Sequence, residues 1–361
     1  MKAKYWFILI IPLVSVCLTF CDRVEEFPDE SQANEGDSPA KRLPVIQDTR
    51  VRIIALNEAS LDYTIADDGG GKIIKHGICW DICPFPYSPK NVITGSSPVQ
   101  KDQFLILNAI IPDTRYYARA FATNSLGTVF GEEVSFTITT QYIQKEVFNP
   151  ELHYGSVSDI DGNTYKTILI GTQTWMAENL KTTKYNDGTP ISNLRGNYDF
   201  AIALTGAYRW FNNDMAHYKV IYGAIYNWNA VATDKLCPAG WHVPSDAEWR
   251  ELELTLGMTW DQMSSYDPFL PRGTMEGNQL KANVGWNDWK GLTGNGTNSS
   301  GFSALPAGGS GWYGEFGGIG RLTDFYAMEE GMARTLTSAD GGIYSAAYPK
   351  QCGFSVRCLK N

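Results

Sequence analysis

The segment Cys237-Pro-Ala-Gly-Trp-His-Val-Pro-Ser-Asp-Ala-Glu-Trp249 contains the clearest helix start in the chain. Ser245 and Glu248 form a capping box: the Ser hydroxyl accepts a hydrogen bond from a backbone N–H of the first turn, and the Glu carboxylate accepts one from the Ser N–H. Gly257 is suited to the position just after the helix. Apolar residues of one helical face follow the capping box, at Trp249, Leu252 and Leu256. The spacing predicts a short helix that stabilises the fold and carries no reactive group.

The N-terminus has the features of an export signal. Residues 1–21 begin with two lysines and continue with an apolar run that is too short for a membrane span. The four residues that end at Cys21 resemble the lipobox of bacterial lipoproteins, in which the Cys is acylated, although the residue before Cys21 is larger than that pattern allows. Cys17 ends a second imperfect match, and cleavage without lipidation is a further alternative. Residues 22–42 are acidic and poor in large apolar side chains, so we expect a flexible tether there.

The composition favours a protein outside the cytoplasm. Lys and Arg number 30 against 39 Asp and Glu, which gives a net charge of −9 and a pI near 5.1, so nucleic acid is not an expected partner. Aromatic residues make up 13% of the chain and charged residues only 19%. Five cysteines remain beyond Cys17 and Cys21, and in an oxidising compartment we expect disulfides with one thiol left over.

Residues 43–140 have the pattern of a β-sandwich, because short runs with strand character alternate with turns. The segment from Ile110 to Tyr116 resembles the fibronectin type III pattern, whose Tyr hydroxyl bonds to backbone upstream. Gly77-Ile-Cys-Trp80 matches a variant that is common in surface proteins of Bacteroidetes. We expect strands at 51–56, 60–65, 73–80, 104–110, 116–123 and 134–139.

Cys79 and Cys83 are four residues apart across a proline-rich loop. A zinc site would need two further ligands, and only His76 is near in sequence. A redox-active pair is usually spaced Cys-x-x-Cys on a helix. We therefore expect a local disulfide between Cys79 and Cys83.

Residues 150–361 resemble a known family. The resemblance rests on five ordered blocks, at 159–180, 222–228, 237–249, 300–309 and 353–358. Together the blocks resemble the Fibrobacter succinogenes major paralogous (FISUMP) domain of bacterial surface lipoproteins. The resemblance implies an irregular α+β domain, similar to C-type lectins and to the formylglycine-generating sulfatase-modifying enzymes. It also implies a disulfide between Cys237 and Cys358, which leaves Cys352 unassigned. The family has no well-established biochemical activity.

The candidate ligand-binding residues are the aromatic side chains of a glycine-rich segment. Gly311-Trp-Tyr-Gly-Glu-Phe316 places Trp312, Tyr313 and Phe316 in an expected surface loop, where the rings could stack on a sugar or a protein. The alternative is that the rings pack back on the domain. Trp286-Asn-Asp288 duplicates a tripeptide of calcium-dependent lectins but lacks their upstream partner loop, so we interpret it as a turn. Asp159-Ile-Asp-Gly-Asn163 lacks a bidentate Glu at the required position and is also interpreted as a turn.

No catalytic or metal-binding residues are assigned. The main alternative is an enzyme related to the formylglycine-generating group, with Cys352 and Cys358 as a redox pair. A purely structural surface component is a third hypothesis. We expect no cofactor, with calcium held by loop oxygens as an open alternative.

The sequence therefore predicts a lipoprotein of the cell envelope, attached to the outer membrane by its lipid and exposed at the surface. We expect it to bind a glycan or a surface protein without catalysis.

Overall fold

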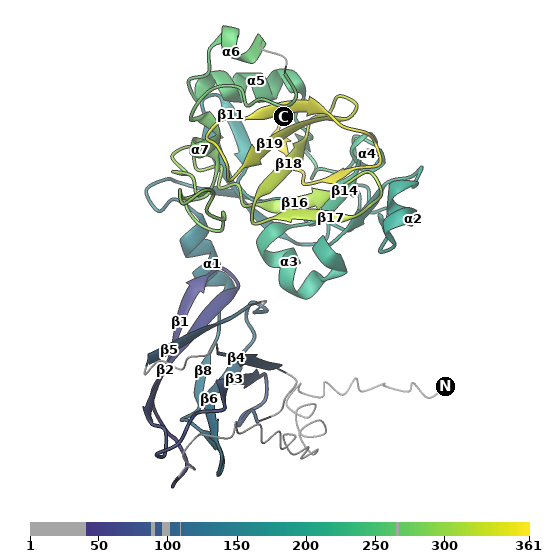
Figure 1. Cartoon of the computed structure of the whole chain (residues 1–361). Coiled ribbons are helices and arrows are strands. Elements are labelled where there is room, and N and C mark those ends of the chain that lie inside the picture. The colour runs from purple at the N-terminus through teal and green to yellow at the C-terminus, as the bar shows by residue number, and fades with distance from the viewer. Residues whose placement is uncertain (1–40, 88–90, 96–101, 109, 265–266) are drawn as a thin grey trace, which may run out of the picture. The chain divides into compact units, whose positions relative to one another are not determined.

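The structure is a computed structural model that describes residues 41–361, apart from 88–90, 96–101, 109 and 265–266 (Figure 1). It divides into two compact units, the first ending at Ile138 and the second extending from Thr139 to Asn361. The proposed signal peptide, the acidic tether and the candidate lipidation sites Cys17 and Cys21 lie outside the described residues.

The first unit is a β-sandwich of two antiparallel sheets, as predicted. One sheet has the order β1-β2-β5, and the other has the order β4-β3-β6-β7 with β8 also paired to β6. The strands are β1 (Val45–Ala55), β2 (Glu58–Asp67), β3 (Lys75–Asp81), β4 (Val92–Thr94), β5 (Asp102–Leu107), β6 (Tyr116–Asn124), β7 (Gly127–Phe130) and β8 (Val134–Phe136). The short strands β4 and β7 were not expected from the sequence, because neither contains a long apolar run.

Alternating side chains explain why these strands form. In β2, Leu61, Tyr63 and Ile65 are buried, and the residues that follow each of them, Asp62, Thr64 and Ala66, are more exposed. The hydroxyl of Tyr116 accepts a hydrogen bond from the Ile111 N–H at 3.2 Å, which is the upstream backbone contact predicted for this Tyr.

The predicted disulfide between Cys79 and Cys83 is wrong in this structure. Both side chains are present as thiols, and both are buried. Cys79 lies in β3, where its Sγ donates to the Pro86 carbonyl oxygen at 2.9 Å. Burial raises the pKa of the Cys79 thiol to about 12, so the sulfur stays protonated at neutral pH. The thiol is therefore used as a packed donor within the sandwich.

The second unit contains two sheets. The smaller one joins the two ends of the unit in the order β15-β22-β11-β10-β9. Its strands are β9 (Gly155–Ser158), β10 (Thr164–Ile170), β11 (Gln173–Met176), β15 (Trp241–His242) and β22 (Leu359–Lys360). The larger one has the order β12-β13-β14-β21-β16-β18-β19-β20, with β17 paired to β16. Its strands are β12 (Ser192–Asn193), β13 (Ala207–Arg209), β14 (Ile225–Asn227), β16 (Ala307–Ser310), β17 (Phe316–Ile319), β18 (Leu322–Tyr326), β19 (Met332–Thr337), β20 (Tyr344–Ala347) and β21 (Gly353–Phe354).

Short helices connect these strands. They are α1 (Thr140–Val147), α2 (Asn197–Ala201), the 3-10 turn η4 (Phe211–Asn213), α3 (Met215–Tyr222), α4 (Trp228–Val231), α5 (Asp246–Thr255), α6 (Trp260–Ser264) and α7 (Glu276–Leu280). Helix α5 begins at the predicted capping box: Ser245 Oγ accepts from Glu248 N at 3.3 Å, and Glu248 Oε2 accepts from Ser245 N at 2.7 Å. Gly257 follows the helix with a φ of 108°, as its predicted role requires.

The core beneath α5 is aromatic. Trp249 lies 4.8 Å from Trp175 and 5.9 Å from Phe302 between ring centroids, and Phe325 completes the cluster. The disulfide between Cys237 and Cys358 joins the segment before α5 to the residue before β22, with 5.9 Å between the two Cα atoms. The pairing implied by the family resemblance is therefore confirmed.

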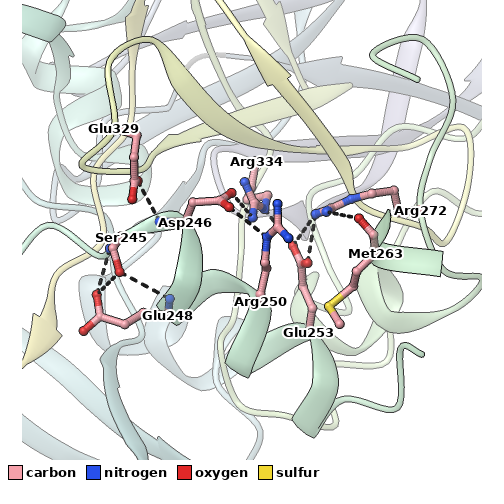
Figure 2. Close-up of polar contacts among 9 residues, drawn as sticks. All are labelled: Ser245, Asp246, Glu248, Arg250, Glu253, Met263, Arg272, Glu329 and Arg334. Carbon is pink, nitrogen blue, oxygen red and sulfur yellow. Dashed lines mark hydrogen bonds and ion pairs between the residues drawn. The ribbon is translucent and has the colours of Figure 1, made fainter. Parts of the chain in front are cut away.

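A buried ionic network attaches α5 to β19 (Figure 2). Glu253 is fully buried and accepts from Arg272 Nη2 at 2.7 and 2.8 Å and from Arg334 Nε at 2.6 Å. Arg334 also donates to Asp246 at 2.6 Å, and Asp246 accepts from Arg250 at 2.8 Å. The sequence did not indicate this network, because Arg272 and Arg334, the two cations that bind Glu253, come from segments distant from α5.

Candidate functional site

The loop between β16 and β17 keeps two of its three predicted binding residues exposed. Trp312 has 60% and Tyr313 has 82% of its surface exposed. Phe316 is different: its ring lies 5.3 Å from that of Phe211 and is half-buried. The structure thus separates the predicted set into two exposed rings and one half-buried ring that packs against Phe211.

Arg209, at the end of β13, forms the base of the loop. Its guanidinium lies between two aromatic rings, 4.2 Å from the centroid of Phe200 and 4.0 Å from that of Phe316. Its Nη2 donates to Ser310 Oγ and to the Gly314 carbonyl oxygen, one on each side of the exposed rings. Because Arg209 is fully buried, these bonds fix the two ends of the turn to the interior of the domain.

Desolvation lowers the pKa of Arg209 to about 10, and the Glu315 carboxylate acts in the opposite direction. The guanidinium therefore stays charged at neutral pH. Its charge remains available for the hydrogen bonds that hold the loop.

The turn also has its own hydrogen bonds. Gly311 N donates to the Glu315 carbonyl oxygen at 2.9 Å, and Gly314 N donates to the Gly311 carbonyl oxygen at 3.0 Å. Tyr313 N donates to Glu315 Oε2 at 3.0 Å. Gly314 has a φ of 78°, in the region that favours glycine. The exposed rings therefore extend from a fixed turn and not from a loose loop.

A third exposed ring, Tyr198, lies in the neighbouring segment. Tyr198 is 72% exposed and follows Asn197, whose Oδ1 accepts from Arg209 Nη1 at 3.2 Å. A Cβ placed on Gly314 would meet the Asn197 carbonyl oxygen at 2.0 Å, so the two backbones are in contact. Figure 1 shows α2 beside β14 and β17. Sequence reasoning missed Tyr198, since more than a hundred residues separate it from Trp312 and no motif links them.

A comparison with protein-family models identifies the family of the second unit. The model of the Fibrobacter succinogenes major domain covers residues 168–360, more than half of the chain. The chain belongs to this family. The predicted family is therefore confirmed, and the loop with Trp312 and Tyr313 lies inside the matched region.

Other comparisons add little. No curated protein matches the chain. Among solved structures, one titled "Myokine structure" is 19% identical with a TM-score of 0.18, covering 28% of this chain and 99% of that one. A human FNIII domain is 13% identical with a TM-score of 0.22, covering 30% and 87%. The twitchin kinase region from C. elegans is 14% identical with a TM-score of 0.23, covering 35% and 20%.

The cysteines of the Fibrobacter succinogenes major domain do not form the redox pair of the enzyme hypothesis. Cys358 is bonded to Cys237, so it is not available to Cys352. Cys352 is 2% exposed, and burial, followed by the nearby carboxylates Asp324 and Glu315, raises the pKa of its thiol to about 12. A reactive cysteine needs an accessible thiolate, and Cys352 has neither the exposure nor the ionisation.

The two motifs that resemble calcium or lectin sites, at Asp159–Asn163 and Trp286–Asp288, make hydrogen bonds within the domain. Asp159 Oδ1 accepts from the backbone N–H groups of Asp161 and Asn163, and Gly162 N donates to the Asp159 carbonyl oxygen at 3.1 Å, which makes the predicted turn. Trp286 is buried, and its Nε1 donates to the Ala304 carbonyl oxygen at 3.0 Å. Within the described residues, no three His, Cys, Asp or Glu side chains gather as a metal site.

A small cavity lies between α1 and the body of the domain. Its volume is about 50 Å³, and Glu178, Lys181 and Arg357 are among its lining residues. The Arg357 guanidinium is hydrogen-bonded to groups of the domain itself: it donates to Asn179 Oδ1 at 2.8 Å, to the Ser303 carbonyl oxygen at 3.1 Å and to the Phe302 carbonyl oxygen. The space suits a few water molecules and not a sugar chain.

Across the part of the chain that the structure describes, no helix is both long and apolar enough to span a lipid bilayer.

Proposed function

We propose that the second unit is a non-catalytic binding module that recognises a glycan through Trp312 and Tyr313. The observation that carries this proposal is the pair of large aromatic side chains held in solvent on a turn that buried Arg209 fixes from below. Packing could have covered these rings, as it covers Phe316, but the structure leaves them exposed.

The chemistry of the rings suits a sugar. One face of a pyranose presents polarised C–H groups, which pack on the electron-rich face of an aromatic ring. Aromatic residues are also common among the few side chains that supply most of the binding energy of an interface. Because the turn is already ordered, binding loses little conformational entropy. Two rings on an ordered turn are therefore suited to bind carbohydrate weakly with little loss of conformational entropy.

The setting of the module is part of the same proposal. The signal-like residues 1–21, with Cys21 as acylation site, and the tether 22–42 would place the protein on the outer membrane with its domains at the cell surface. The β-sandwich would act as a spacer, and the second unit would be an irregular α+β domain of C-type-lectin-like fold. No metal or cofactor is part of this proposal.

Glycan arrays test the proposal directly. The protein is compared with Trp312→Ala and Tyr313→Ala, and with Phe269→Ala as a matched control, because Phe269 is 85% exposed but lies outside the loop. We expect each loop variant to lose at least about tenfold in affinity, which corresponds to about 1.4 kcal/mol, and the control to bind normally.

Two results would reject the proposal. One is binding that survives both loop substitutions, since the glycan would then bind elsewhere. The other is the absence of binding to any glycan, which would favour a protein partner or a structural role.

A further inference from the structure

We propose that the glycan is an uncharged, extended polysaccharide that contacts Tyr198 together with Trp312 and Tyr313. This inference rests on the proposed function and specifies its ligand. It adds a third binding residue from α2, and it excludes acidic polysaccharides and single terminal sugars as the main ligand.

Three rings from two segments point to a chain of several sugars. The backbones of Asn197 and Gly314 are in contact, and Tyr198 and Tyr313 are their neighbours in sequence, so the two tyrosines start from adjacent points of the backbone. Trp312 precedes Tyr313 on the same turn, and all three side chains are more than half exposed. One ring covers about one sugar face. A polymer can contact several rings at once, and each further contact is made at high effective concentration.

Glycines flank the two exposed rings of the turn. Gly311 and Gly317 flank the exposed residues and add no side chain of their own, and the side chain that lies beside Gly311 is that of Glu315. The space where a Cβ of Gly317 would lie is open to 4 Å. A flat, extended ligand can therefore lie across the site, whereas a deep pocket for one terminal sugar is not formed by these residues.

Charge selects against an acidic ligand. The only charged residue in segment 307–319 is Glu315, and the only one in segment 196–204 is Asp199. Arg209 lies below the loop but is fully buried and donates to the loop itself. Arg195, just before α2, donates to the Asn213 carbonyl oxygen at 3.3 Å. A polyanion would therefore meet carboxylates at the exposed rings, on a protein whose net charge is −9.

Affinity electrophoresis separates the ligand classes. The protein is run through gels that contain a neutral polymer (hydroxyethylcellulose, xyloglucan, laminarin or galactomannan) or an acidic one (alginate, polygalacturonate or hyaluronan). We expect retardation by at least one neutral polymer and by none of the acidic ones. For the polymer that binds, calorimetry with its oligosaccharides should show at least about tenfold tighter binding of a hexasaccharide than of the monosaccharide.

Tyr198→Ala should weaken hexasaccharide binding by about threefold or more and leave monosaccharide binding unchanged, because it removes a contact that only the longer ligand reaches. Phe269→Ala again serves as the control. Raising the salt concentration from about 50 to about 500 mM should leave the affinity nearly constant, since no ion pair contributes.

The outcomes distinguish the two proposals. Preferential binding of acidic polymers, or equal affinity for monosaccharide and hexasaccharide, would overturn this inference while glycan binding through Trp312 stands. A Tyr198→Ala variant with normal hexasaccharide affinity would remove Tyr198 from the site. If no polymer and no glycan binds, the proposed function and this inference both fail.

Discussion

Replacing Glu253 by Gln tests whether the buried ionic network holds the second unit together. The Glu253 carboxylate is fully buried and accepts three hydrogen bonds from Arg272 and Arg334. In the Gln variant the amide oxygen can still accept from Arg272 Nη2 and Arg334 Nε, but the second oxygen becomes an NH2 group and the negative charge is lost. Arg334 keeps its ion pair with Asp246, whereas the Arg272 guanidinium, with its side chain 5% exposed, loses its buried counter-ion. Removing one partner of a buried ion pair costs about 3–5 kcal/mol, a large part of the stability of most domains.

Urea unfolding followed by tryptophan fluorescence measures this loss. Trp6 and Trp80 lie outside the second unit, so nine of the eleven tryptophans report on it. Glu251→Gln is the matched control, because Glu251 is an exposed residue of the same helix, and it should change the free energy of unfolding by no more than about 0.5 kcal/mol.

The reasoning also predicts a partial rescue. Adding Arg272→Met to Glu253→Gln removes the unpaired cation and should recover part of the lost stability, because an apolar side chain tolerates burial. If Glu253→Gln unfolds at the same urea concentration as Glu251→Gln, the network does not stabilise the domain and the argument is refuted.

Three further changes test other parts of the structure. Replacing Cys237 and Cys358 by Ser removes a cross-link over 121 positions and should lower the free energy of unfolding by about 4–5 kcal/mol, measured in urea without reductant. Burial raises the pKa of Asp324 from 3.8 in the unfolded chain to about 6 in the folded domain. The free energy of unfolding should therefore be highest below pH 3.8 and should fall by about 3 kcal/mol as the pH rises through about 6. Thermal melts at a series of pH values should show this fall, and Asp324→Asn should remove most of it. Gly314→Ala places a Cβ 2.0 Å from the Asn197 carbonyl oxygen and should destabilise by about 1–3 kcal/mol, with faster amide exchange in the loop.

Local features of the sequence were sufficient for the elements with short-range causes. The capping box at Ser245 and the glycine at 257 specify the ends of α5 through groups only a few residues apart. The alternation of apolar residues likewise indicated the longer strands of the first unit, such as β2 and β6. The shorter strands β4 and β7 were missed, because three or four residues carry too little periodicity.

Spacing along the chain was a poor guide to cysteine pairing. Cys79 and Cys83 are near in sequence and remain thiols, whereas Cys237 and Cys358 are 121 positions apart and form the disulfide. The second pairing came from the family resemblance and not from the residues themselves. Whether two sulfurs meet depends on where the strands bring the two Cα atoms, which local sequence does not encode.

The sequence by itself determined the helix at Ser245, the sandwich, the family and the glycine-rich aromatic segment as a candidate site. Only the tertiary structure decided which of those aromatic residues are exposed. Phe316 is half-buried because Phe211 of η4 and Arg209 of β13 pack against it, while Trp312 and Tyr313 remain in solvent. It also brought Asn197, the residue before Tyr198, into backbone contact with Gly314 of the turn that carries Trp312 and Tyr313. Exposure and proximity depend on contacts between residues distant in sequence, whereas helix capping and strand periodicity depend on residues that are neighbours in the chain.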